Sequence, residues 1–259
     1  MKEQREKKSP LKTTPLREAG QSAREQRDDY VMGKAFFWVI FPMVTILFAG
    51  FEWVRWWRKM SPDPVLWTVI AVLACAVAVW QMFVTKRKAQ PMNLGVEGEQ
   101  VVGQRLEELR SAGYKVFHDI PGDGFNVDHV IVGPGGVFVV ETKTRSKSAG
   151  PDVKVVYDGK TLTVDGIAPD RDAIAQVKAA SSYVEGIIKR STGHEVEAQP
   201  VVLFPGWYTK QPKRPDVWVL NETVFPQWVE GAWDELDGVT VNQIADSIRM
   251  HVENKSRAL

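Results

Sequence analysis

The chain has 259 residues, a formal net charge of +1 and one cysteine. This length allows one good-sized domain and a smaller element beside it. The near-neutral total excludes a protein that is basic throughout, although a local groove can still be basic. Cys75 has no partner for an intrachain disulfide, so the chain is built without disulfides and fits a reducing compartment.

Residues 1–34 are polar and carry charges of both signs, with almost no large apolar side chains. A segment of this composition cannot bury enough apolar surface to offset the entropy of ordering its backbone. We therefore predict a disordered or loosely helical charged tail over residues 1–34. A helix docked on the rest of the chain is the alternative.

Two apolar stretches follow at residues 35–54 and 64–84, each about 20 residues long, which is the length a helix needs to cross ~30 Å of hydrocarbon. The second stretch has no charged residue, and the first has only Glu52, near its end. Six of the ten tryptophans lie between positions 38 and 80, towards the stretch ends, as in an aromatic belt. Residues 35–86 are therefore predicted to be a two-helix transmembrane hairpin, with buried soluble helices as the alternative.

Basic residues on the flanks predict the orientation of this hairpin. Lysines and arginines before the first stretch and after the second outnumber those in the short linker between the stretches. The positive-inside rule then places both termini and the following domain in the cytoplasm, in a multi-pass protein of the inner (cytoplasmic) membrane. Neither stretch has an acid or base near its middle, so we interpret the hairpin as a lipid-bilayer anchor; a homo-oligomer is possible.

From about residue 93 the pattern becomes that of an α/β domain. Apolar residues at helical spacing predict a helix that ends near Gly113. Alternating and continuous apolar runs then predict strands, a second helix, further strands and a closing amphipathic helix. A hairpin with Asp158 and Gly159 as its two-residue turn is expected within residues 153–166. The order predicts a mixed sheet flanked by helices. The expected elements are a helix before 113, strands at 114–120, 126–133 and 136–143, a helix at 170–190, strands at 199–206 and 216–221, and a helix at 240–255.

Charged side chains stand at the ends of the two apolar strands at 126–133 and 136–143. Glu141 and Lys143 are two residues apart, so both side chains point to one face of their strand. If the hairpin centres on residues 133–136, Asp128 pairs near Glu141. Two carboxylates at that distance repel each other unless a cation lies between them. The alternative is a surface salt bridge between Lys143 and either acid.

Carboxylate oxygens with water in the remaining positions suit Mg²⁺ or Mn²⁺. Such an ion can activate water and stabilise charge on a phosphodiester, and a nearby lysine can position that water or neutralise the developing charge. The strand ends around Asp128, Glu141 and Lys143 are therefore the candidate site for this chemistry.

The region that contains these strands resembles the nuclease-related domain family, NERD. The motifs that carry the resemblance are a helix start with Gly95, Gly98 and Glu99, the Asp128-His129 pair after a hydrophobic residue, a Gly-Pro-x-Gly turn and a Glu-x-Lys strand end. The resemblance covers about residues 93–205. It implies the PD-(D/E)xK nuclease fold, an α/β fold in which a mixed sheet is flanked by helices.

This resemblance implies a metal-dependent phosphodiesterase site. Asp128 and Glu141 would be the metal ligands for Mg²⁺ or Mn²⁺, and Lys143 would be the catalytic lysine. Glu99 would be a supporting acid that orients water or a second metal. Gln176, on the following helix, matches a polar position that such folds often aim at the site; an exposed glutamine without a role is the alternative.

Other polar residues carry weaker signals. His129 follows Asp128 and should point to the opposite face of its strand, towards the core. His118 and Asp119 end a strand and are expected in solvent. The histidines and the cysteine have no zinc spacing. Basic residues follow the candidate site at 143, 145, 147, 154 and 160. They either meet a phosphate backbone or form a solvated loop.

The leading hypothesis is a membrane-anchored, metal-dependent nuclease that cuts DNA on the cytoplasmic side. One alternative is a nuclease fold that binds nucleic acid or a protein without cutting, so whether the chain is an enzyme stays open. Another is a hairpin that assembles into oligomers and carries a ligand-sensing domain. Residues 206–259 are predicted to be a strand and helix extension packed on the nuclease-like domain at 93–205, with their tryptophans in the packing.

Overall fold

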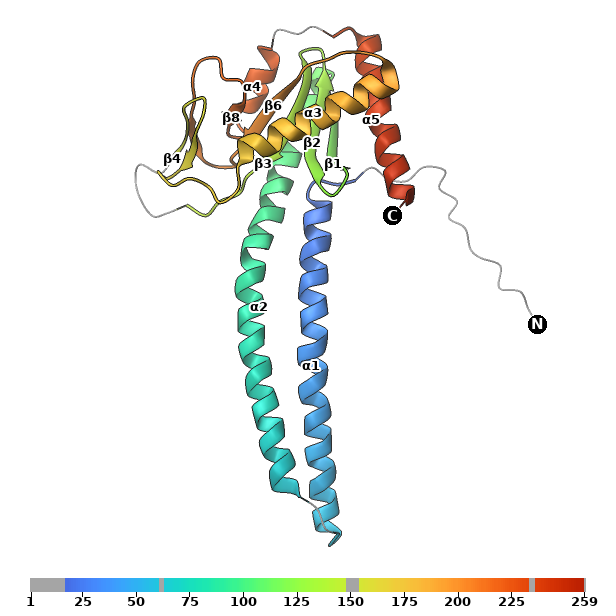
Figure 1. The fold of residues 1–259 in the computed structure, drawn as a ribbon, viewed down its shortest axis with the longest axis vertical. Coiled ribbons are helices and arrows are strands. Elements are labelled where there is room, and N and C mark those ends of the chain that lie inside the picture. The colour runs from blue at the N-terminus through green and yellow to red at the C-terminus, as the bar shows by residue number, and fades with distance from the viewer. Residues whose placement is uncertain (1–16, 61–62, 148–153, 233–235, 259) are drawn as a thin grey trace, which may run out of the picture. The chain divides into compact units, whose positions relative to one another are not determined.

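A computed structural model describes residues 17–60, 63–147, 154–232 and 236–258 of the chain. The chain divides into two compact units. One unit comprises residues 22–96, and the other comprises residues 97–259 together with residues 1–21. Figure 1 shows the ribbon of the chain.

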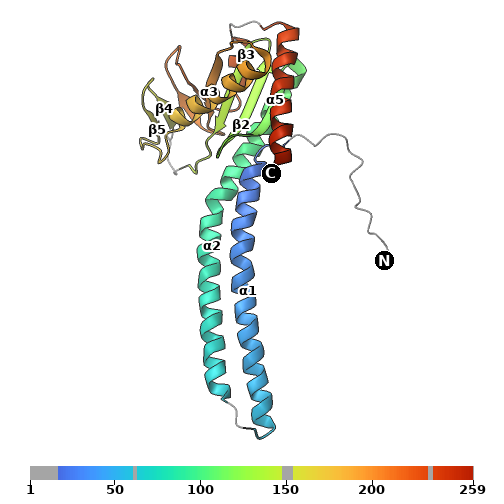
Figure 2. The same ribbon diagram turned by 45° about the vertical axis from the view of Figure 1, so that its right-hand side comes forward.

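The unit at residues 22–96 is a pair of long helices. Helix α1 spans Gln21–Trp57, and helix α2 spans Pro64–Glu107 and continues into the other unit. The two helices run side by side in opposite directions, as Figures 1 and 2 both show. The indole Nε1 of Trp53 donates a hydrogen bond of 3.1 Å to Thr68 Oγ1, and the ring of Phe48 stacks on that of Trp67.

Both helices are long and apolar enough to cross a membrane. In the most apolar stretch of each, only 6% and 11% of the residues are buried. A core helix of a soluble protein is instead mostly buried, so this exposure argues against the buried-helix alternative.

The start of α1 corrects the expected tail over residues 1–34. Residues 21–34 are helical, and residues 1–16 lie outside the described part of the chain. Extending an existing helix costs far less than nucleating one, so the apolar helix can carry a polar segment along with it. A contact with α2 supports this segment, because Arg27 Nη1 donates to Asn93 Oδ1 at 3.4 Å.

Helix α2 also joins two elements that the sequence separates. The second apolar stretch and the first helix of the α/β domain are one continuous helix, with Pro91 inside it. A short 3₁₀ helix, η1 (Glu108–Ala112), follows, and Gly113 ends it with a φ of 88°. Glycine adopts this left-handed conformation without strain, so the expected stop at Gly113 is confirmed.

The unit at residues 97–259 contains a mixed sheet with the order β1-β2-β3-β6-β8. The pairs β1–β2 and β2–β3 are antiparallel, whereas β3–β6 and β6–β8 are parallel. The expected mixed α/β fold is therefore confirmed. The strands of this sheet are β1 (Lys115–Pro121), β2 (Asn126–Gly133), β3 (Gly136–Thr142), β6 (Ala198–Leu203) and β8 (Trp218–Leu220).

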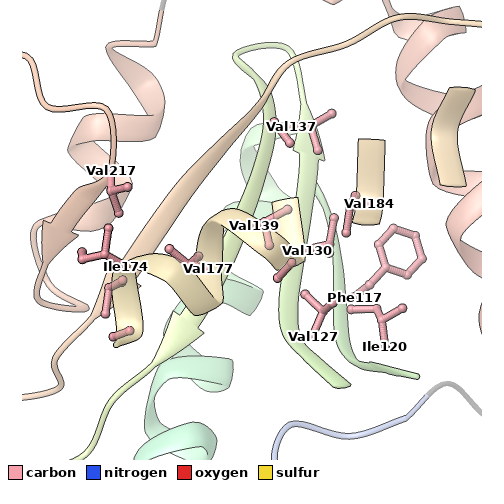
Figure 3. Packing of buried hydrophobic residues seen from close by; sticks show 14 of the residues in the cluster. Phe117, Ile120, Val127, Val130, Val137, Val139, Ile174, Val177, Val184 and Val217 are labelled. Carbon is pink, nitrogen blue, oxygen red and sulfur yellow. The ribbon is translucent and has the colours of Figure 1, made fainter. Parts of the chain in front are cut away.

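Helices cover both faces of this sheet. One face packs against α3 (Ala173–Thr192) and α5 (Gly238–Ala258), and Figure 3 shows Val177 and Val184 of α3 over the valines of β2 and β3. The other face packs against the end of α2, η1 and α4 (Phe225–Glu230). Because β2 and β3 are buried on both faces, their apolar runs are nearly continuous.

A second, three-stranded sheet has the order β5-β4-β7. Its strands are β4 (Lys154–Tyr157), β5 (Leu162–Val164) and β7 (Tyr208–Lys210). The expected two-residue turn is wrong: Tyr157 pairs with Leu162, which leaves the four residues 158–161 in the turn. Asp158 Oδ1 closes the turn by accepting the backbone N–H groups of Lys160 and Thr161 at 2.8 and 2.7 Å. The sequence also gave no indication of β7.

Candidate active site

The register of β2 and β3 places Asp128 opposite Glu141. His129 pairs with Val140 in an antiparallel ladder, and the next residues outward are these two acids. Asp128 is half-buried, and its Oδ2 accepts the backbone N–H of Thr142 at 2.7 Å. Glu141 is only 4% exposed. The structure thus brings the two expected metal ligands together at one end of the strand pair.

Lys143 and Gln176 both contact Glu141. Lys143 Nζ donates to Glu141 Oε1 at 2.6 Å and to Gln176 Oε1 at 2.9 Å. Gln176 Nε2 donates to the same Glu141 oxygen at 2.6 Å. The backbone N–H of Lys143 pairs with the carbonyl of Leu203 at 2.8 Å, so the lysine stays on the sheet. A carboxylate, an ammonium and an amide therefore form one closed hydrogen-bonded group.

The first turn of α3 carries Gln176 to this group. Asp172 caps the helix, because its Oδ1 accepts the N–H groups of Ile174 and Ala175, both at 3.0 Å. Ile174 and Val177 then fix the turn in the core beneath the sheet face. Gln176 is exposed to solvent, yet its Oε1 and Nε2 are both hydrogen-bonded within the site, to Lys143 and Glu141.

Glu99 reaches the site from α2, beyond the apolar stretch of that helix. The adjacent Gly98 explains how closely the helix approaches the end of β3. A Cβ at Gly98 would lie 1.8 Å from Thr144 Oγ1 and 2.9 Å from Thr144 Cβ. At Gly95 a Cβ would have no atom within 4 Å. Of these two glycines, Gly98 is therefore the one whose missing side chain permits the contact that places Glu99.

Burial raises the pKa values of all three acids of the site, and neighbouring acids raise those of Glu99 and Asp128 further. Burial, followed by Asp119 and Glu141, raises the pKa of Glu99 to about 7. Burial, followed by the charges of Glu141 and Glu99, raises the pKa of Asp128 well above its usual value. Burial also raises the pKa of Glu141, although Lys143 opposes this effect. Without a cation, full ionisation of this cluster is costly.

Asp119 is an acid of the site region that the sequence did not reveal, and its expected solvation is wrong. It is 4% exposed and has a φ of 51°. Its two oxygens contact Arg17 Nε at 2.9 Å and Asn126 Nδ2 at 3.2 Å. These partners compensate the buried charge. Arg17 is distant in the chain, and Asn126 lies across a turn from Asp119. No local pattern could therefore have indicated the burial of Asp119.

A hydrogen-bonded chain lies on the other side of β2. His129 is fully buried, as expected; its Nδ1 lies 2.8 Å from His118 Nδ1 and its Nε2 lies 3.2 Å from Thr142 Oγ1. His118 Nε2 contacts Glu107 Oε1 at 2.8 Å. The expected solvation of His118 is therefore wrong. Burial lowers the pKa of both imidazoles, so both are neutral at pH 7. Thr142 connects this chain to Asp128.

The donor set fits a hard divalent cation. Within the described residues, no group of three or more His, Cys, Asp or Glu side chains is placed to hold a metal by itself. An ion bound to Asp128 and Glu141 would therefore complete its shell with water, which is how Mg²⁺ commonly binds. The raised pKa values favour this fit, because acids that repel each other when ionised gain most from a cation between them.

Comparison with known proteins places these residues in a described family. Residues 94–205 match the nuclease-related domain family, NERD. Part of the chain is similar to an uncharacterized protein of Bacillus anthracis, with 37% identity over 62 residues. The match covers 22% of this chain and 29% of the length of that relative. No solved structure matches the chain. The chain thus contains, at residues 94–205, a nuclease-related domain.

Proposed function

We propose that the chain is a membrane-anchored, metal-dependent nuclease that hydrolyses phosphodiester bonds of DNA. One observation carries the proposal: Asp128 and Glu141 stand opposite each other at the buried ends of β2 and β3, with Lys143 held against Glu141. A domain that only binds a partner has no need for acids that repel each other in its interior.

In the proposed site, Asp128 and Glu141 would hold Mg²⁺ or Mn²⁺. When bound, such an ion supplies charge stabilisation at the phosphate and a water molecule of lowered pKa. The Lys143 ammonium would stabilise negative charge that develops on the phosphoryl oxygens. Gln176 would fix the direction of that ammonium, because its Oε1 accepts from Lys143 at 2.9 Å. Glu99, with a pKa of about 7, suits a group that orients water and accepts its proton near neutral pH.

The anchor is the second part of the proposal. The apolar stretches of α1 and α2 would span the bilayer, because almost none of their residues are buried. Basic residues on the outer flanks would lie on the cytoplasmic side, which places the nuclease-related domain there as well. Chromosomal, plasmid or entering DNA close to the membrane is the substrate that such an enzyme could reach.

The test is cleavage by the full chain in detergent of plasmid, linear duplex and single-stranded DNA, and of RNA. Each substrate is incubated with Mg²⁺, with Mn²⁺ and with a chelator. Cutting should need metal and should fall by at least about 100-fold in Asp128→Ala and Lys143→Ala, in line with the loss of one transition-state stabilising group.

Lys115→Ala is the matched control, since Lys115 is exposed at the far end of β1, where it pairs with Val132. Its cleavage should equal that of the wild type. Cleavage of RNA alone would move the substrate from DNA to RNA. If no substrate is cut with either metal, or if the two site variants cut as fast as Lys115→Ala, the nuclease proposal fails.

A further inference from the structure

The small sheet β5-β4-β7 has an inner and an outer face. Val155 and Tyr157 of β4 are buried on the inner face. Lys154 pairs with Tyr208, and Val156 pairs with both Lys210 and Thr163, so these alternate residues share the opposite side. We call this side the small-sheet face. It consists of Lys154, Val156, Thr163, Tyr208 and Lys210.

The small-sheet face combines an exposed aromatic ring with positive charge. Tyr208 is 70% exposed on a strand, which leaves its ring open to solvent. Lys154 and Lys210 are both exposed. Lys154 lies opposite Tyr208 on β4, and Lys210 lies two residues after Tyr208 on β7. No residue of the face is acidic. The nearest acids in sequence are Asp152, which lies outside the described residues, and Asp158 and Asp165, which lie in the turns that follow β4 and β5.

Two further basic residues lie between the candidate active site and this face along the chain. The segment after Lys143 carries Arg145 and Lys147, and it contacts Trp207. The buried indole Nε1 of Trp207 donates to the carbonyl of Arg145 at 3.2 Å, and Lys147 Nζ lies 5.6 Å from the centre of the ring. Arg145 Nη2 also lies 3.8 Å from Asp170 Oδ2. Tyr208 follows Trp207 directly, so the residue that contacts the basic segment is adjacent to the one that presents the aromatic ring.

This combination matches the chemistry of an unpaired nucleic-acid strand. Cations attract the phosphates, and an exposed aromatic ring offers a surface on which a base can stack. The bases of a duplex are already stacked within the helix, so the ring gives no comparable gain there. An acidic peptide could satisfy the lysines but has no group that requires the tyrosine ring.

We propose that the small-sheet face binds single-stranded nucleic acid, with a base on Tyr208 and phosphates at Lys154 and Lys210, and leads that strand along Arg145 and Lys147 to Lys143. This inference rests on the proposed nuclease function, because it names the form of substrate that the site receives. The sequence leaves Arg145, Lys147 and Lys154 as either phosphate contacts or parts of a solvated loop. In this proposal they are phosphate contacts.

The test measures binding without cutting. The full chain in detergent, with metal chelated, is titrated into a fluorescently labelled 20-nucleotide single strand and into the corresponding duplex, and anisotropy is recorded at several salt concentrations. Tyr208→Ala should weaken single-strand binding by about 5- to 100-fold and leave duplex binding unchanged. Tyr208→Phe, which keeps the ring, should restore the affinity. Melting temperatures of both variants check that the exposed substitution leaves the fold intact.

The lysines are tested separately with the double variant Lys154→Gln and Lys210→Gln. Loss of two phosphate contacts should reduce the slope of log affinity against log salt by about 1.4 for the single strand. Lys115→Gln, on an exposed lysine remote from the face, is the control and should leave the slope unchanged. Unchanged single-strand affinity in Tyr208→Ala overturns the proposal. So does equal loss for strand and duplex, or a labelled polyglutamate peptide that binds as tightly as the strand and in the same Tyr208-dependent manner.

The same experiment separates this proposal from the nuclease proposal. If the wild type cuts no substrate yet shows binding that depends on Tyr208, the nuclease proposal falls and the small-sheet face stands. If the wild type cuts and Tyr208→Ala binds the single strand normally, the nuclease proposal stands and the small-sheet proposal falls.

Discussion

The two units of the chain place their side chains in opposite ways. The helical unit at residues 22–96 exposes large apolar residues, such as Leu47 at 64% and Leu73 at 60%. The α/β unit at residues 97–259 buries acids, such as Glu141 at 4% and Asp119 at 4%. Each arrangement is costly in water unless other groups, from the chain or from its surroundings, compensate it.

The difference indicates what each unit lacks. Exposed apolar helices are stable in hydrocarbon, and buried acids that repel each other are stable around a cation. Asp119 shows the contrast within one unit, because Arg17 and Asn126 already compensate its charge. Asp128 and Glu141 face each other, and the only cation bonded to either is Lys143 among the described residues. The proposed bilayer and metal ion therefore follow from one physical rule applied to two surroundings.

The largest expected effect comes from placing charge on the exposed apolar surface. The double variant Leu47→Arg and Leu73→Arg puts one arginine near the middle of each apolar stretch. Insertion should become less favourable by about 6 to 8 kcal/mol in total. The fraction of the chain that stays with membranes after alkaline extraction measures this, with Leu47→Phe and Leu73→Phe as the control. A charged variant that remains in the membrane fraction like its control would contradict the anchor.

A smaller effect is expected where α2 meets the end of β3. Gly98→Ala should destabilise the α/β unit by about 1 to 3 kcal/mol, because the new methyl group overlaps Thr144. Gly95→Ala meets no atom and should be neutral or stabilise the helix by up to ~1 kcal/mol. Hydrogen exchange of the β2 and β3 amides measures the difference. Equal exchange in the two variants would show that the close approach at Gly98 is not needed.

The smallest effect concerns pH. The pKa of Glu99 is raised to about 7 from 4.5, so the folded state binds a proton that the unfolded state releases. Stability should therefore fall as pH rises from about 4.5 to 7, and the full penalty should be present above 7. Glu99→Gln removes the charge and should stabilise the metal-free protein by about 1 to 2 kcal/mol at pH 8, after allowance for solvent screening.

Urea unfolding of the full chain in detergent and chelator, at pH 5 and pH 8, measures this pH effect. The advantage of Glu99→Gln should fall at pH 5 to about a quarter of its value at pH 8. An advantage of the same size at both values would mean that the substitution acts through packing and not through charge.

The sequence predicts much of the site because the site depends on local rules. The period of two along a strand places Glu141 and Lys143 on one face, and the short turn at residues 133–136 brings Asp128 opposite Glu141. The mixed sheet follows from the order of the elements. The resemblance to NERD adds Glu99 and Gln176, and the structure places Gln176 against both Glu141 and Lys143.

What the sequence did not predict depends on contacts between distant segments. Strand β7 has three residues, too few for a pattern, and it forms only because it pairs with β4. The burial of Asp119 depends on Arg17, far away in the chain. Helix α2 runs through the change from apolar to amphipathic sequence, since a shift of composition does not end a helix when both sides favour one.

The most direct test of the central claim is the melting temperature of the wild type and of Asp128→Asn, with and without Mn²⁺ at pH 8. Asparagine still accepts the N–H of Thr142 but carries no charge. We expect Mn²⁺ at about 100 times its dissociation constant to raise the melting temperature of the wild type by about 5 to 10 °C. Asp128→Asn should melt higher than the wild type without metal and show no rise with it. No rise in the wild type, or an equal rise in both proteins, would contradict a metal site at Asp128 and Glu141.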